Sequence, residues 1–328
     1  MNKVARLPAA ERRDLFQESA RERGTNPAII EKDFWVCWAL KQLFADPELG
    51  TRLVFKGGTT LSKVFGLIDR FSEDIDLVLD WQLLGYGPGK EDPYQDFESK
   101  GKQDRFNKSI NRKAADYIAG TLTPYLQKLF ASCSEIRVSV DTTDPNALNV
   151  AYPAAFSEDY LRPEVRLEIG PLASWVPSNR HVIHPYAADA FPKVFEDPAC
   201  PVVAITAERT FWEKATILHQ EAYRPGAMPS RHSRHYYDMF KLAASSRTAA
   251  CPQGHGTLET GCRIQAAILS RRLGALRRRQ TRNLPLDTGY RAPVRVATRL
   301  SGYGNDDLRR DAEVRYSNRL FERAGRRN

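Results

Sequence analysis

The sequence predicts an α+β fold in which helices flank a sheet and a helical part follows at the C-terminal side. Two observations lead to this prediction. Short apolar stretches, several of them alternating with polar residues, recur between residues 53 and 205, and longer stretches with apolar residues at three- and four-residue steps lie around them. With 328 residues, the chain can bury a sizeable core as one large or two modest domains.

Two helices are predicted before the first strand. The first spans residues 8–23 and is followed by Gly24, and the second opens at Asn26-Pro27 and runs to about Phe44. We expect both helices to cover the sheet. The charged triplet at residues 31–33 fits either a substrate-facing cluster or a solvated helix face.

Residues 53–79 combine a glycine turn with a pair of acids. A short strand, Leu53–Phe55, leads into Gly57 and Gly58, which lack a Cβ and let a ligand approach the backbone. Thr59 is placed to cap the helix that follows. The N-terminus of that helix would present backbone N–H groups to an anion, and phosphate is the natural ligand.

The next predicted strand carries Asp74 and Asp76. Apolar Ile75, Leu77 and Leu79 alternate with these acids, which is the pattern of a half-buried strand. Residues two apart on a strand project from one side about 6.6 Å apart. From there two carboxylates can converge on a hard cation such as Mg²⁺. Like charges this close need a cation or a proton between them.

The turn Lys56–Thr59, followed by Arg-Phe-Ser-Glu-Asp-Ile-Asp-Leu at residues 70–77, resembles the AbiEii/AbiGii toxin family, to which the MenT toxins are related. A Gly-Gly-Thr turn, a helix and then Asp-x-Asp is also similar to the signature of the polymerase-β-like nucleotidyltransferases. Thr59 stands where Ser is common, and the spacer is somewhat long. The resemblance implies a polymerase-β-like nucleotidyltransferase mixed sheet flanked by helices, with a helical C-terminal part.

The resemblance also implies a third carboxylate, which is expected on the predicted strand 164–169. Glu168 is the candidate, and Glu164 and Arg166 are read as lying on the alternative face and as weaker candidates. Three convergent acids can hold two metal ions, one lowering the pKa of the attacking hydroxyl and one clamping the triphosphate.

Two later motifs complete the resemblance. The first is Glu208-x5-Lys214 on a predicted helix, and the second is Arg-His-Tyr-Tyr-Asp at residues 234–238. The resemblance implies that Lys214 reaches the nucleotide phosphates and that Asp238 is an orienting residue or a base at the edge of the site. The expected catalytic residues are Asp74, Asp76, Glu168, Lys214 and Asp238, the first three as metal ligands; the expected nucleotide-binding residues are Lys56, Gly57, Gly58, Thr59, Ser72 and Lys214.

Between these motifs, Arg224, Arg231 and Arg234 fit either a grip on a phosphate backbone or a plain surface role. The long loop 81–101 follows the acid-bearing strand and is a candidate lid or acceptor contact.

We expect four regions along the chain: N-terminal helices at residues 1–50, a nucleotidyltransferase core at 51–205, a helical region with the Lys and Asp motifs at 206–244, and an Arg-rich tail at 245–328. From residue 242 onward the chain holds 18 arginines, no lysine and seven acids, whereas residues 1–241 carry a net charge of −2. The family resemblance is expected to stop near Leu242. The tail fits either an RNA-gripping arm or a disordered segment.

Five scattered cysteines suggest neither a disulfide framework nor a zinc site. No apolar run approaches the roughly 18 residues of a membrane span, and we expect a cytoplasmic protein.

The resemblance implies a metal-dependent nucleotidyltransferase toxin that uses Mg²⁺, in a two-ion site, and an NTP. It would transfer NMP to an acceptor, the tRNA 3′ end, within a toxin–antitoxin or phage-defence system that includes a cognate antitoxin. One alternative is a nucleotidyltransferase acting on a protein or small molecule. Another is a non-catalytic nucleotide- or RNA-binding module.

Overall fold

The computed structural model describes residues 1–87, 93, 97–156, 161–222 and 232–245. The chain divides into two compact units, Met1–Ala275 and Leu276–Asn328, and every described residue belongs to the first. Almost all of the Arg-rich tail lies outside the described residues, and so do residues 88–92 and 94–96 of the candidate lid 81–101.

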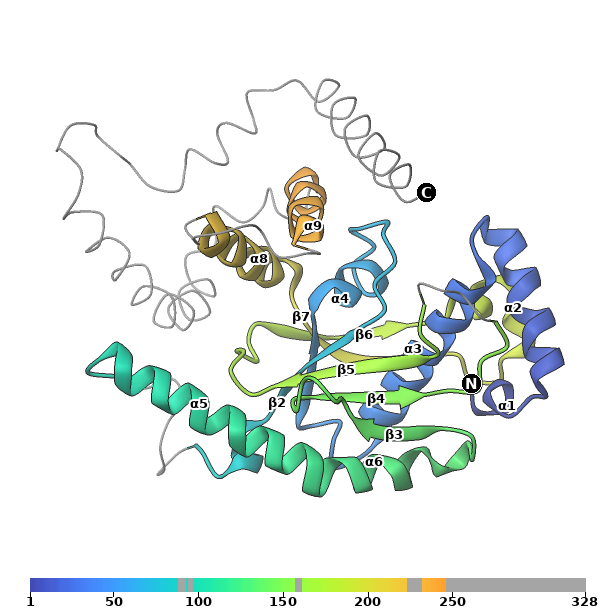
Figure 1. Cartoon of the computed structure of the whole chain (residues 1–328). Helices are drawn as coiled ribbons and strands as arrows, with labels where there is room; N and C mark the ends of the chain where they lie inside the picture. Colours follow the sequence, from blue (N-terminus) through green and yellow to red (C-terminus); the bar gives the residue numbers. More distant parts are fainter. Residues whose placement is uncertain (88–92, 94–96, 157–160, 223–231, 246–328) are drawn as a thin grey trace, which may run out of the picture. The chain divides into compact units, whose positions relative to one another are not determined.

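A seven-stranded mixed sheet forms the centre of the described part (Figure 1). The strand order is β3-β4-β5-β2-β1-β7-β6, in which β2 pairs with β5 and β1 with β7 in parallel and the other neighbours are antiparallel. This arrangement confirms the predicted mixed sheet. The strands are β1 (Leu53–Lys56), β2 (Ile75–Leu79), β3 (Arg137–Val140), β4 (Ala147–Ala151), β5 (Glu164–Gly170), β6 (Ser178–Ile183) and β7 (Cys200–Ile205).

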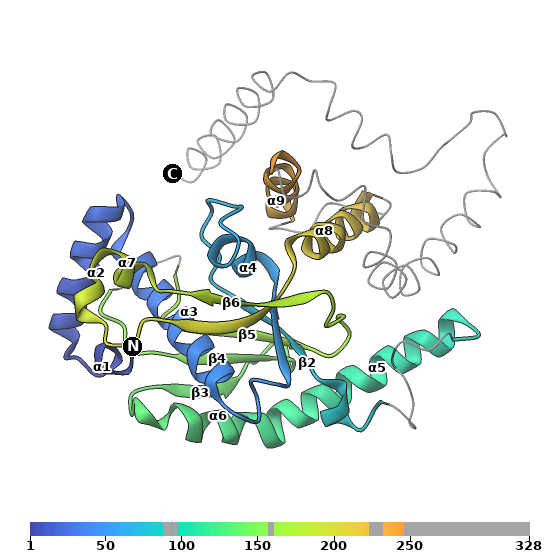
Figure 2. The same cartoon turned by 180° about the vertical axis from the view of Figure 1, so that it is seen from behind.

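One face of the sheet packs on the main hydrophobic core (Figure 2). The helices on this side include α3, whose largest aromatic side chains, Trp35 and Trp38, are fully buried. Asn26 caps α3 by accepting from the backbone N–H of Ala28 at 2.8 Å, as the sequence predicts. The helices here and at the sheet's margin are α1 (Asn2–Ala5), α2 (Ala9–Arg23), α3 (Pro27–Ala45), α5 (Lys100–Tyr117), α6 (Thr123–Leu129) and α7 (Tyr186–Ala190).

The charged triplet on α3 is not solvated, so the prediction of a solvated helix face was wrong. All three side chains are almost fully buried. Glu31 accepts hydrogen bonds from two backbone N–H groups of the loop after β4. Lys32 pairs with Glu73 at 3.2 Å, and Asp33 pairs with Lys63 at 2.7 Å. These contacts attach two segments to α3: the loop before β2, residues 70–74, which we call the acid loop, and the helix after the glycine turn.

The opposite face of the sheet carries α4 (Gly57–Lys63), α8 (Ala207–Ala222) and α9 (Ser233–Ala244) (Figure 1). A small hydrophobic cluster joins these three helices to the loop after α4. Its buried members are Leu61, Ile68, Ala207 and Leu242, and Phe65, Leu67, Phe211 and Tyr237 pack against them. The cluster therefore holds α8 and α9 beside the glycine turn.

Two elements are irregular or hard to recognise in the sequence. A π-helical turn at Ile118–Leu122 separates α5 from α6, and there the Thr123 hydroxyl donates to the Ile118 carbonyl at 2.7 Å. Strand β6 was missed because it is an edge strand with mostly polar residues, so the apolar alternation is absent. Within the described residues, no helix has the length and apolar character needed to cross a membrane.

Candidate active site

The acids predicted as metal ligands come from two neighbouring strands. Asp76 lies on β2 and is the register neighbour of Glu168 on β5. Both side chains face away from the main core, because the residues flanking them on each strand are the buried ones. Asp74 directly precedes β2, so the strand begins one residue later than predicted.

The charges of these acids act on one another. The pKa of Asp76 is raised to about 6. Burial is the largest cause, Glu168 and Asp74 contribute to the rise, and Lys56 and Lys214 oppose it. Burial also raises the pKa of Asp74, again with Glu168 contributing. Within the described residues, no hydrogen bond or ion pair neutralises the Asp76 carboxylate. The acids thus form a region of excess negative charge.

Carboxylates are the ligands that Mg²⁺ prefers, so the donor chemistry fits a divalent cation. The described side chains do not, as they stand, gather three His, Cys, Asp or Glu residues into a metal-binding group. Glu168 is about half exposed and is held by Arg166 at 3.2 Å, and Arg166 also pairs with Asp141 at 2.5 Å. The residue types therefore fit, without a closed ligand set.

The sequence interpretation of β5 needs a correction. Glu164, Arg166 and Glu168 share one face of the strand, whereas Val165 and Leu167 are buried on the other. Arg166 is consequently a neighbour of Glu168 and orients it.

The conformation of the glycine turn depends on Asp76 and on the acid loop. Gly57 has φ +86°, and a Cβ there would lie 1.9 Å from Asp76 Oδ2. A Cβ on Gly58 would lie 2.8 Å from Arg70 Nη2 and 2.9 Å from Ser72 Oγ. A side chain at either position would collide with the acid or with its loop. The absence of side chains at the two glycines therefore leaves room for the side chains of Asp76, Arg70 and Ser72.

Thr59 is not a helix cap, contrary to the prediction. It lies inside α4, where Lys56 occupies the N-cap position. The fully buried Thr59 hydroxyl donates to the Asp74 carbonyl at 2.5 Å and lies 3.0 Å from the Ser72 hydroxyl. This side chain fixes the position of Asp74 relative to the glycine turn.

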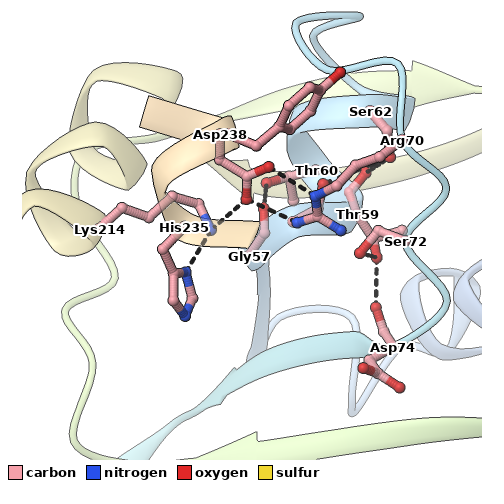
Figure 3. Close-up of polar contacts among 12 residues, drawn as sticks. Gly57, Thr59, Thr60, Ser62, Arg70, Ser72, Asp74, Lys214, His235 and Asp238 are labelled. Carbon is pink, nitrogen blue, oxygen red and sulfur yellow. Dashed lines mark hydrogen bonds and ion pairs between the residues drawn. The ribbon is translucent and has the colours of Figure 1, made fainter. Parts of the chain in front are cut away.

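On the helix side of the site, Asp238 is enclosed by two cations (Figure 3). The Arg70 guanidinium donates to both Asp238 oxygens at 2.7 Å, and Lys214 Nζ lies 2.9 Å from one of them. Asp238 is fully buried. Burial alone would raise its pKa, but the hydrogen bonds and charges of Arg70 and Lys214 outweigh this and hold the pKa below its ordinary value. A carboxylate bound in this way suits an orienting residue better than a base.

Lys214 has a second neighbour on α9. Its Nζ lies 3.5 Å from His235 Nδ1. Burial, followed by the charges of Lys214 and Arg234, lowers the pKa of His235 to about 4. The ring is therefore neutral at pH 7, and its Nδ1 can accept from the lysine ammonium group. Two residues of α9 thus orient one cation of α8.

Comparison with known proteins identifies the family. The model of the AbiEii toxin family, nucleotidyl transferases of type IV toxin–antitoxin systems, matches residues 38–281. The chain belongs to the AbiEii family. AbiEii membership makes it a nucleotidyltransferase of a toxin–antitoxin family and confirms the resemblance seen in the sequence. The match continues 39 residues past Leu242, so the expected end of the resemblance was placed too early.

Other comparisons add little to the AbiEii assignment. No curated protein matches the chain. Among solved structures, it is similar to the MenT4 nucleotidyltransferase toxin from Mycobacterium tuberculosis H37Rv, with 15% identity over 79% of this chain and 98% of that one and a TM-score of 0.38. A likeness this weak carries no argument about fold or site.

In this AbiEii chain, the predicted site residues lie around one region. Glu168 and Lys214 both act on the pKa of Asp76, and Lys56 is the register partner of Asp76 on β1. Arg234 is exposed on α9 and lowers the pKa of Asp74, whereas Arg224 and Arg231 lie outside the described residues. The roles of these residues stay predictions.

Sequence reasoning missed Arg70 and His235 as site residues. Both stand inside the motifs that carry the family resemblance, Arg70 two residues before Ser72 and His235 directly after Arg234. The signal was therefore present, but only the fold shows that Arg70 meets Asp238 across 168 residues of chain.

Proposed function

We propose that this AbiEii nucleotidyltransferase transfers a nucleoside monophosphate from an NTP to an acceptor hydroxyl, releasing pyrophosphate, with a divalent cation held by Asp74, Asp76 and Glu168. One observation carries the proposal. Burial and the nearby charge of Glu168 raise the pKa of Asp74 and of Asp76 at the open face of the sheet, and Lys214 is close enough to oppose the shift of Asp76. A cation would relieve this repulsion.

The chain's own residues would act mainly by positioning and charge neutralisation. Lys214 would neutralise the triphosphate, and Asp238, held by Arg70, would orient Lys214. The backbone of Gly57 and Gly58 would contact phosphate oxygens, with Lys56 and Ser72 beside them. Thr59 would hold Asp74 in place through its carbonyl.

Mg²⁺ is the cation that best fits an all-carboxylate donor set next to substrate phosphates. When bound, it would polarise the transferred phosphoryl group and neutralise charge that develops there. A thermal-shift titration tests this without any turnover. Mg²⁺ should raise the Tm of the wild type and leave that of Asp76→Asn unchanged, and equal shifts in both proteins would contradict the proposed ligands.

We further propose the tRNA 3′ end as the acceptor, a cognate antitoxin as partner and a cytoplasmic site of action in a toxin–antitoxin or phage-defence system. The proposed organisation is residues 1–50, 51–205 and 206–244 as successive parts of the enzyme, with residues 245–328 as a tail. Family membership supports the antitoxin and the NTP, and the acceptor needs its own test.

The decisive experiment offers each labelled NTP to purified enzyme with total tRNA, total protein or an aminoglycoside. Label should enter tRNA with the wild type and not with Asp76→Asn. Label in protein or aminoglycoside alone would replace the proposed acceptor by one of the alternatives. No transfer to any of them, together with unchanged cellular toxicity of Asp76→Asn, would indicate a non-catalytic binding module.

A further inference from the structure

Helix α5 presents a face of almost uniformly positive charge. Its buried side chains, Phe106, Ile110 and Ala114, recur every fourth residue and pack on the main core. Six of the nine exposed residues are cations and one is an acid. These nine are Lys100, Gly101, Lys102, Arg105, Lys108, Ser109, Arg112, Lys113 and Asp116.

Five of these six cations make no ion pair among the described residues, and the Lys113 ammonium group lies 4.2 Å from the centroid of the Tyr86 ring. Residues 1–241 carry a net charge of −2, so the positive charge of this helix face is a local feature and not a property of that part of the chain. Lys102 pairs with Glu98 at its N-terminal end. Within the described part of the chain, Lys108 and Arg112 make no ion pair, and Arg105 donates only to the Gly101 carbonyl. Arg105, Lys108 and Arg112 follow one another at three- and four-residue steps, where like charges repel, and among the described residues no ion pair with Asp104 or Asp116 offsets this repulsion.

The position of α5 leaves this face open. The helix lies on the sheet face opposite α4, and its N-terminal half extends beyond the ends of the strands, on the side of the molecule where α8 lies (Figures 1 and 2). Arg105, Lys108 and Arg112 span about 10 Å along the helix axis. Over that length one strand of a nucleic-acid duplex presents about three phosphates, at ~3.4 Å each.

We propose that this basic face, Lys102, Arg105, Lys108, Arg112 and Lys113, binds the phosphate backbone of the nucleic-acid acceptor. The inference rests on the proposed function, because it assigns a binding surface to the acceptor of that reaction. A protein partner fits less well. Cores of protein interfaces are enriched in aromatic residues and depleted in lysine, whereas the exposed part of α5 has no apolar side chain and four lysines. Lysine and arginine are the residues that neutralise phosphates.

The test compares the full-length wild type with the triple variant Arg105→Ala, Lys108→Ala, Arg112→Ala. Alanine has the highest helix propensity, so α5 should still form. The matched control removes three exposed cations elsewhere, Arg21→Ala, Lys128→Ala and Lys193→Ala, for the same loss of net charge. All three proteins keep the arginine-rich C-terminal residues, whose contribution to RNA binding is therefore the same in each.

Binding of total tRNA is measured over a salt series, with NMP transfer to the same tRNA assayed in parallel. Removing three phosphate contacts should weaken tRNA binding about 10- to 100-fold near 0.1 M salt and reduce the slope of log K against log salt by about 2 to 3. The KM for tRNA should rise accordingly, with kcat and the KM for NTP unchanged. The control variant should behave like the wild type.

A triple variant with the affinity and salt slope of the control would overturn the inference. If it binds tRNA normally but has lost binding to polyglutamate, the face belongs to an acidic protein partner, which also overturns the inference. Should the wild type transfer nucleotide only to protein or aminoglycoside, the proposed acceptor fails. The binding measurement still decides whether the α5 face contacts phosphates.

Discussion

The strand side and the helix side of the site differ in whether protein cations balance their carboxylates. On the strand side, burial raises the pKa of Asp74 and of Asp76, the charge of Glu168 adds to both shifts, and the Asp76 carboxylate has no neutralising partner among the described residues. On the helices, Asp238 is bound by Arg70 and Lys214 at 2.7 and 2.9 Å and its pKa is lowered. On the strand side a ligand would have to balance the carboxylate charge. On the helix side Arg70 and Lys214 already balance Asp238, and we call these three residues the clamp.

The difference has an energetic consequence. Removing one member of a buried, paired set leaves the others uncompensated and destabilises the fold. Removing one member of a set of repelling charges relieves the fold while it removes function. The same kind of substitution, aspartate to its neutral amide, should therefore have opposite effects on stability on the two sides.

The largest effect on stability is expected at the clamp. Asp238→Asn should lower the free energy of unfolding by about 3–5 kcal/mol, because Arg70 loses a bidentate carboxylate partner in a buried setting. Urea denaturation measures this. Asp69→Asn is the matched control. Asp69 pairs at 2.7 Å with Lys241 of α9, the helix that carries Asp238, but its side chain is 80% exposed. This substitution should lower the free energy of unfolding by less than about 1 kcal/mol. Equal losses in the two variants would remove the distinction between buried clamp and surface pair.

On the strand side, Asp76→Asn should reduce NMP transfer by at least about 100-fold and at the same time stabilise the fold. The pKa of Asp76 is raised to about 6, so the folded state binds its proton more tightly than the unfolded state, and stability falls as pH rises from about 4 to 6. An amide avoids this loss, and the free energy of unfolding at pH 7 should increase by about 1–3 kcal/mol.

Asp80→Asn is the control for that substitution, four residues along the same segment. Asp80 is buried but already paired with Arg52 at 2.5 Å, so its amide variant should be less stable than the wild type. An Asp76→Asn protein that is also destabilised would show that the strand acids are compensated after all.

A smaller effect is expected from His235 in acid. Its pKa is lowered to about 4, so between pH 6.5 and 4 the unfolded chain binds a proton that the folded chain does not. Stability from this group is therefore present above pH 6.5 and is lost as pH falls through that window, by about 1–2 kcal/mol after allowance for its partial exposure. His235→Gln should flatten this part of the stability profile, measured by urea denaturation from pH 7.5 to 4.5. An unchanged profile would mean that His235 titrates normally.

The smallest effect, about 1 kcal/mol, is expected from Thr59→Val, which removes the hydroxyl bound to the Asp74 carbonyl. Transfer activity should fall more than stability does, because the acid loop loses its attachment to the glycine turn. Thr60→Val is the control. Thr60 is equally buried, but its hydroxyl donates to the Gly57 carbonyl within the same turn, so that variant should lose stability without a matching loss of activity.

Much of the fold could be predicted because local chemistry decides it. Helices α2 and α3 follow from Gly24 and Asn26 at their ends, and both flanking residues take the predicted roles. The alternation around Asp76 predicts the strand and its open face. Strand β6 escaped prediction because edge strands need no apolar face. The shared face of Glu164, Arg166 and Glu168 was misread, although the two-residue period of a strand places all three side chains on one side.

By itself, the sequence determined the family, the residue types of the site and the acid pair at the start of β2, because motifs and two-residue periodicity are properties of neighbouring residues. Only the tertiary structure decided that Thr59 holds the acid loop, that Glu31, Lys32 and Asp33 are internal, and that Arg70 meets Asp238. Each of these facts depends on partners that lie between 15 and 168 residues away along the chain, and burial and pairing exist only once those segments have packed together.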